Sequence, residues 1–73
     1  MSDRIVILFY SNNYAIWAKK VFERLGVVSE LISVPRHLSS DCGYCLSVLR
    51  DNQAQCQEIL DSQAIEYDRF ESF

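Results

Sequence analysis

Residues 5–13 read Ile5-Val6-Ile7-Leu8-Phe9-Tyr10-Ser11-Asn12-Asn13, a continuous apolar run that passes directly into three residues favoured at helix N-caps. A half-exposed strand would alternate apolar and polar residues, so the run predicts a central strand that is buried by a helix on one face. The helix after it is expected to begin at residues 11–13 and to end at Gly26. Its predicted inner face consists of Tyr14, Ala18, Val21, Phe22 and Leu25.

The rest of the chain continues the alternation of strand and helix patterns. It predicts a second strand over 28–34, a third over 44–49, and a second helix capped by Asp51 or Asn52 with Cys56, Ile59 and Leu60 on its inner stripe. Residues 64–70 predict a final strand whose charges suit an exposed edge. The order βαββαβ predicts an α+β fold, a ferredoxin-like split βαβ with a four-stranded antiparallel sheet and two helices on one face.

Composition limits the class of protein. The 73 residues leave room for a single domain over 1–73, and 49% hydrophobic residues with only 2 Gly and 1 Pro indicate a globular chain. A core of this size supplies only ~3–5 kcal/mol net, so packing against a partner, as in a weak homodimer, would add stability.

Charge and cysteine count narrow the partners and the compartment. The net charge of −3 opposes a nucleic-acid footprint, and no apolar segment approaches the length needed to span a membrane. The first residues lack the proportions of a signal peptide, and three cysteines are an odd count for an exported chain. We therefore expect a cytoplasmic protein with reduced thiols.

A second informative stretch covers residues 34–43, Val-Pro-Arg-His-Leu-Ser-Ser-Asp-Cys-Gly. Pro35 has no N–H for a sheet ladder and ends the preceding strand, while Arg36 adds a permanent cation. Ser39 and Ser40 suit a tight turn, and Gly43 leaves the backbone beside the Cys42 sulfur open to approach. The loop is therefore a candidate site for thiolate chemistry.

The predicted topology places this loop in space. A right-handed β-α-β crossover brings the loop between the second and third strands to the end of the sheet where the first helix begins. Cys42 is thus expected near Ser11, Asn12 and Asn13, where the helix N-terminus favours an anion. With Arg36 close by, this setting would lower the thiol pKa below its free value of about 8.5.

The motif resembles that of the small bacterial proteins known as selenium/sulfur carrier-like, whose hallmark is a Pro-Arg pair, a Ser-rich stretch and Cys-Gly. The matching positions are Pro35, Arg36, Ser39, Ser40, Cys42 and Gly43. The resemblance spans nearly the whole chain, since Ser11, Ala15 and Gly26 fit the family's first helix. Two positions depart from it: Tyr14 stands where an acidic residue is usual, and Cys45 stands where an apolar residue is usual.

The resemblance implies a relay protein rather than a stand-alone enzyme. Cys42 would be the carrier thiol, Arg36 would stabilise the thiolate, and Gly43 and Ser11 would shape the loop and the helix N-terminus around it. The thiolate would take a sulfur or selenium atom from a donor protein and pass the atom to an acceptor protein. This reading requires protein partners but neither a cofactor nor a metal.

Two other functions remain open from the residues. The spacing of Cys42 and Cys45 fits a dithiol redox pair, although such motifs normally open a helix and Cys45 is expected in a strand. A metal site would combine His37, Cys42 and Cys45, but the sequence supplies no second ligand pair. His37 is alternatively a base beside Cys42 or a solvated loop residue.

The remaining candidates lie on the two helices. Cys56 is expected to be a buried, inert thiol. Ile16 and Trp17 fall outside the best core stripe of the first helix and form a candidate docking patch, unless the helix is rolled so that Trp17 is buried. The basic side chains of this helix, Lys19, Lys20 and Arg24, are expected to form a solvated face.

Overall fold

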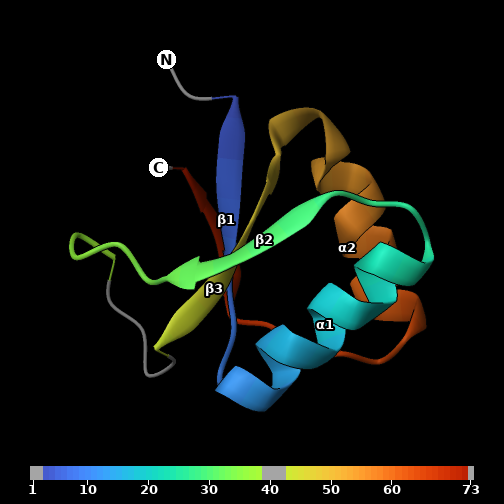
Figure 1. The fold of residues 1–73 in the computed structure, drawn as a ribbon, viewed down its shortest axis with the longest axis horizontal. Coiled ribbons are helices and arrows are strands. Elements are labelled where there is room, and N and C mark those ends of the chain that lie inside the picture. Colours follow the sequence, from blue (N-terminus) through green and yellow to red (C-terminus); the bar gives the residue numbers. More distant parts are fainter. Residues whose placement is uncertain (1–2, 39–42, 73) are drawn as a thin grey trace.

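A computed structural model describes residues 3–38 and 43–72 (Figure 1). Its elements are β1 (Arg4–Leu8), α1 (Asn12–Arg24), β2 (Ser29–Ser33), β3 (Tyr44–Leu49), a 3-10 turn (Arg50–Asn52), α2 (Gln53–Ser62) and β4 (Arg69–Ser72). Neither helix within these ranges has both the length and the apolar character needed to cross a bilayer.

The four strands form one sheet in the order β2-β3-β1-β4, and every neighbouring pair is antiparallel. Helices α1 and α2 both cover the same face of this sheet (Figure 1). The prediction of a ferredoxin-like α+β fold with a central first strand is therefore confirmed. Ile7 lies at the middle of β1, opposite Leu46 of β3 and Phe70 of β4.

The main core lies between the sheet and the helices. Apolar positions two apart on β1 meet apolar positions three or four apart on α1, because strand and helix side chains repeat with these periods. The fully or almost fully buried members include Ile5, Ile7 and Phe9 near β1, Ala15, Ala18, Val21 and Phe22 of α1, and Cys56, Ile59 and Leu60 of α2.

A second, smaller cluster lies on the face that carries no helix, which we call the open face. Val6, Leu8 and Cys45 point to this face and are fully buried. Partly buried apolar side chains cover them: Ile32 of β2, and Val34 and Leu38 from the segment after β2. The continuous apolar character of β1 is thus explained by burial on both of its faces.

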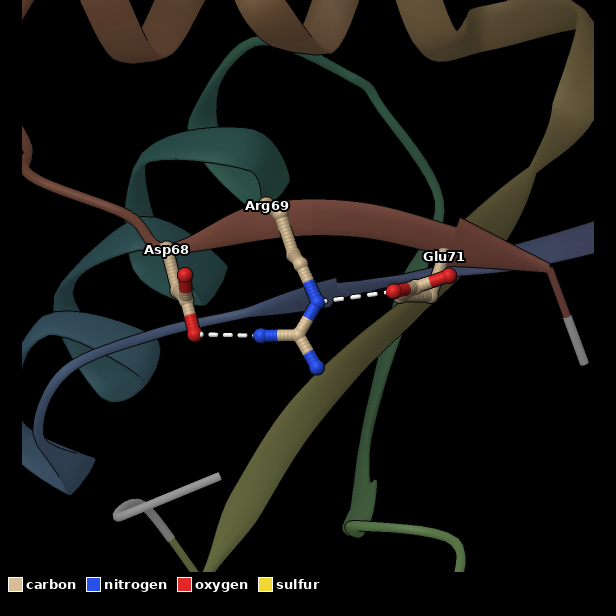
Figure 2. Close-up of polar contacts among 3 residues, drawn as sticks. All are labelled: Asp68, Arg69 and Glu71. Atoms are coloured by element: carbon tan, nitrogen blue, oxygen red, sulfur yellow. Dashed lines mark hydrogen bonds and ion pairs between the residues drawn. The ribbon is translucent and has the colours of Figure 1, made fainter. Parts of the chain in front are cut away.

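Polar side chains complete the open face. The Arg4 Nε donates a hydrogen bond to the buried Ser47 Oγ at 2.7 Å, and its Nη2 donates to the Ser47 carbonyl at 3.2 Å. Arg69, the cross-strand neighbour of Leu8, lies between the carboxylates of Asp68 and Glu71, with both contacts at 2.7 Å (Figure 2). The hydrogen bond to Glu71 raises the pKa of Arg69 above its ordinary value, so this cation is permanent.

Both helices end in the same C-terminal motif, which agrees with the predicted helix end at Gly26 and corrects the predicted start of the final strand. Gly26 has a φ of +79°, and Val27 N–H bonds back to the Phe22 carbonyl at 2.8 Å. At the end of α2, Ala64 adopts the same left-handed conformation with a φ of 56°, and Ile65 N–H bonds to the Leu60 carbonyl at 2.9 Å.

The predicted final strand over 64–70 is consequently wrong in position. Ala64 and Ile65 complete the end of α2, and β4 pairs with β1 only from Arg69 to Ser72. The charged edge strand itself is present. The other strands differ by smaller amounts: β1 ends at Leu8 instead of residue 10, and β2 covers only Ser29–Ser33.

Two serines of the sheet provide a matched stability test. The hydroxyl of Ser29 is buried without a hydrogen-bond partner among the described residues, whereas the Ser47 hydroxyl accepts from Arg4. We expect Ser29→Ala to leave the free energy of unfolding unchanged or raise it by up to about 1 kcal/mol, and Ser47→Ala to lower it by about 1–2 kcal/mol. Urea unfolding followed by circular dichroism measures both. A larger loss for Ser29→Ala than for Ser47→Ala would contradict this account.

Candidate functional site

One end of the sheet gathers the described parts of the predicted site. The first strand leads into the N-terminus of α1 there, β2 ends there, and β3 begins there at Tyr44 (Figure 1). These segments contain the described site residues that the sequence predicted, which are Ser11, Asn12, Asn13, Arg36, His37, Gly43 and Cys45. Cys42 lies outside the described residues, as do Ser39, Ser40 and Asp41.

The N-terminus of α1 has the electrostatic character of an anion site. Ser11 is the N-cap in extended conformation, and its Oγ accepts from the Tyr14 N–H at 3.5 Å. The first turn contains no carboxylate, and Tyr14 is its third residue. The partial positive charge of the helix dipole is therefore not neutralised from within the helix.

The segment after β2 turns back over the open face. A turn closes at residues 35–38, where the Leu38 N–H donates to the Pro35 carbonyl at 3.0 Å. Arg36 and His37 occupy the middle of the turn and are exposed, whereas Val34 and Leu38 pack onto the cluster of Val6, Leu8 and Cys45. The packing of Val34 and Leu38 therefore holds the turn against the sheet, while Arg36 and His37 remain at the surface.

Gly43 connects the loop to the helix N-terminus. Its carbonyl accepts from the Val34 N–H at 3.2 Å, which extends the β2–β3 ladder by one pair. A Cβ atom built on Gly43 would lie 4.0 Å from Oδ1 of Asn12. The residue that directly follows Cys42 in the chain therefore lies beside the first residue of α1.

The two described cysteines are both buried. Cys45 belongs to β3, opposite Leu8 and Ile32, and its Sγ lies 4.0 Å from the Ser33 carbonyl oxygen. It is fully buried beside Val6 and Leu8, where a cysteine behaves as a small apolar side chain. Cys56 is fully buried in α2, and desolvation raises its pKa to about 11.

The described residues contain no group of three or more His, Cys, Asp or Glu side chains arranged to hold a metal ion. Of the three ligands considered from the sequence, His37 is exposed in the turn and Cys45 is buried on the sheet, while Cys42 is not described.

Sequence reasoning missed two features of this region. It did not foresee that Val34 and Leu38 bury Cys45, although two apolar residues four apart around Pro35 were a signal for such packing. It also did not foresee that Tyr14 and Trp17 stack, with ring centroids 6.4 Å apart and an interplanar angle of 26°. Their i, i+3 spacing on one helix is the corresponding signal.

Comparisons with known proteins give one match. The model of the protein family described as "Putative Se/S carrier protein-like" matches residues 4–71. Neither the curated proteins nor the solved structures gave a match to this chain.

The burial of two thiols generates a labelling prediction. At neutral pH the folded protein should react with iodoacetamide at Cys42 first, because Cys45 and Cys56 are fully buried and Cys56 keeps its proton up to about pH 11. Both buried thiols should become reactive when urea unfolds the chain. Mass spectrometry of the labelled peptides over a pH series gives the three rates. Faster labelling of Cys45 or Cys56 than of Cys42 in folded protein would refute the site assignment.

Proposed function

Because the chain belongs to the Se/S carrier-like family, we propose that it holds a sulfur or selenium atom on Cys42 and relays that atom between a donor and an acceptor protein. The observation that carries the proposal is the position of Gly43, whose added Cβ would lie 4.0 Å from Oδ1 of Asn12. It brings the chain directly after Cys42 to a helix N-terminus with no carboxylate in its first turn.

The proposed chemistry is an exchange that needs no external oxidant. The Cys42 thiolate attacks the outer sulfur of a donor persulfide, so that a new S–S bond forms as the donor's S–S bond breaks. The donor leaves as a thiolate, and the transferred sulfur keeps its oxidation state. A donor perselenide reacts in the same way through its outer selenium. The second transfer, to the acceptor, reverses these roles.

Positive charge supports the reactive form of the sulfur. A thiolate at a helix N-terminus is favoured by the partial charge and the N–H groups of the first turn. Arg36 lies exposed in the turn at 36–37, within the same segment between β2 and β3. We therefore assign thiolate stabilisation to Arg36 and to the N-terminus of α1 that Ser11 caps, with Asn12 and Asn13 flanking it.

The position of Cys45 argues against a dithiol redox function. Three steps along an extended strand cover about 10 Å, whereas disulfide formation requires Cα atoms within about 7 Å. Cys45 lies in the extended strand β3, and its side chain is buried with Val6 and Leu8. A bond to Cys42 would require a sharp bend ahead of the strand and removal of the Cys45 sulfur from that cluster.

A relay of this kind works through protein partners. We propose a donor such as a cysteine desulfurase and an acceptor protein that consumes the sulfur or selenium. The thiols would have to stay reduced between transfers, so the proposed compartment is the cytoplasm.

A pair of cysteine variants tests the carrier function. Incubation with a cysteine desulfurase and cysteine should add one sulfur atom to the wild-type chain and to Cys45→Ser, but none to Cys42→Ser, because transfer needs only the Cys42 thiolate. Intact-mass measurement under non-reducing conditions reads the added sulfur. If Cys45→Ser loses sulfur loading and also loses a reversible internal disulfide, the dithiol function replaces the carrier function.

We expect Arg36 to affect the reactivity of Cys42 without affecting the stability of the fold. Arg36→Ala should raise the pKa of Cys42, seen as a shift to higher pH of its alkylation profile, because a nearby cation is removed. The melting temperature should hardly change, since Arg36 is exposed. Arg36→Lys serves as the charge-retaining control. A large loss of stability with an unchanged alkylation profile would show that Arg36 has a structural role instead.

A further inference from the structure

The outer surface of α1 carries large apolar side chains that the fold does not use. Ile16 and Trp17 each retain 42% of their surface exposed, while the opposite side of the helix is buried through Ala15, Ala18 and Phe22. These two side chains therefore lie on the side of α1 that does not pack on the sheet. The roll of the helix therefore leaves Trp17 outside the core.

Trp17 is held in place although it is exposed. It stacks on Tyr14, one turn earlier in the same helix, with ring centroids 6.4 Å apart. Tyr14 is itself partly buried against the main core. An exposed indole with a fixed orientation loses little conformational freedom on binding, which is the property of an interface anchor.

Two unpaired cations continue the same surface. Lys20 follows Trp17 by three residues and Arg24 follows it by seven, so both lie on the same side of the helix as Trp17. Lys19 pairs with Glu23, but neither Lys20 nor Arg24 forms an ion pair with any residue in 3–38 or 43–72. Like charges four residues apart repel each other, and although the helix dipole favours Arg24 in the last turn, no ion pair within the helix offsets the charge of Lys20.

We propose that Ile16, Trp17, Lys20 and Arg24 form the docking surface for the protein that donates sulfur or selenium to Cys42, and that this donor presents an apolar groove edged by carboxylates. The inference rests on the proposed carrier function. Trp17 would fill the groove, and the two cations would meet acidic side chains at its rim.

The location of this surface suits a transfer reaction. Trp17 lies within two turns of the N-terminus of α1, and Asn12 at that N-terminus lies beside Gly43. A donor seated on this side of α1 would therefore have its reactive sulfur within reach of the loop between β2 and β3. The net charge of the chain is −3, so the basic surface also orients an acidic partner toward this one region.

The test compares a protein donor with a small donor. Persulfide formation on Cys42 is followed by intact mass, either with a cysteine desulfurase and cysteine or with inorganic polysulfide. Trp17→Ala should slow loading from the desulfurase about tenfold at low carrier concentration, through a higher apparent KM. Lys20→Glu and Arg24→Glu should do the same, and added salt should reduce the wild-type rate. Loading from polysulfide should stay within about twofold in all of them.

Two control variants repeat an apolar truncation and a charge reversal away from the proposed surface. Val28→Ala alters an apolar side chain that is 64% exposed, and Arg50→Glu reverses an exposed charge, both at the opposite end of the sheet. Neither should change loading from the desulfurase.

Three results would overturn the inference or its premise. If the desulfurase loads the wild-type chain no faster than it loads Trp17→Ala, the proposed docking surface is wrong. A wild-type dimer that Trp17→Ala converts to monomer, seen by light scattering, shows that a second copy occupies the surface instead. Absence of loading on Cys42 even from polysulfide contradicts the carrier function itself.

Discussion

Burial of β1 on both faces is the constraint on which the rest of the structure depends. Ile5 and Ile7 face the helices, whereas Val6 and Leu8 face the side of the sheet that no helix covers. Removing those two side chains from water is favourable only if something else packs onto the open face. The cover comes from β2 and from the chain directly after it, so the segment that leads into the Cys42 loop is part of the core.

This packing fixes the two described ends of the segment that contains Cys42. Val34 and Leu38 attach one end of the loop to the sheet, and the hydrogen bond from Val34 to the Gly43 carbonyl closes its base. Arg36 lies exposed between the two apolar contacts. Neighbouring residues of one turn therefore have different roles. Val34 and Leu38 contribute to the stability of the fold, and Arg36 is proposed to stabilise the Cys42 thiolate.

Burial also sets two of the three cysteines apart from the proposed thiol chemistry. Cys45 and Cys56 are buried in different clusters, on opposite faces of the sheet, and serve as small apolar side chains. Desolvation keeps Cys56 protonated well above neutral pH. Cys42 lies outside the described residues, between a Pro-Arg pair and Gly43 in the sequence, and it is the thiol to which we assign the proposed carrier function.

Apolar periodicity and the caps at Ser11 and Gly26 were enough to predict the order of elements, the central place of the first strand and most of the buried face of α1. Leu25 is the exception, since it was predicted on the inner face and is 52% exposed at the end of the helix. The sequence pattern misplaced the last strand, because the left-handed conformation of Ala64 carries no signal in a residue that normally avoids it. The handedness of the crossover was enough to predict that the loop next to Gly43 lies near Asn12, which the described part of the loop agrees with. The packing of Val34 and Leu38 over Cys45 was not foreseen, because it depends on the register of the sheet and on the path of the chain after β2, which no local pattern encodes.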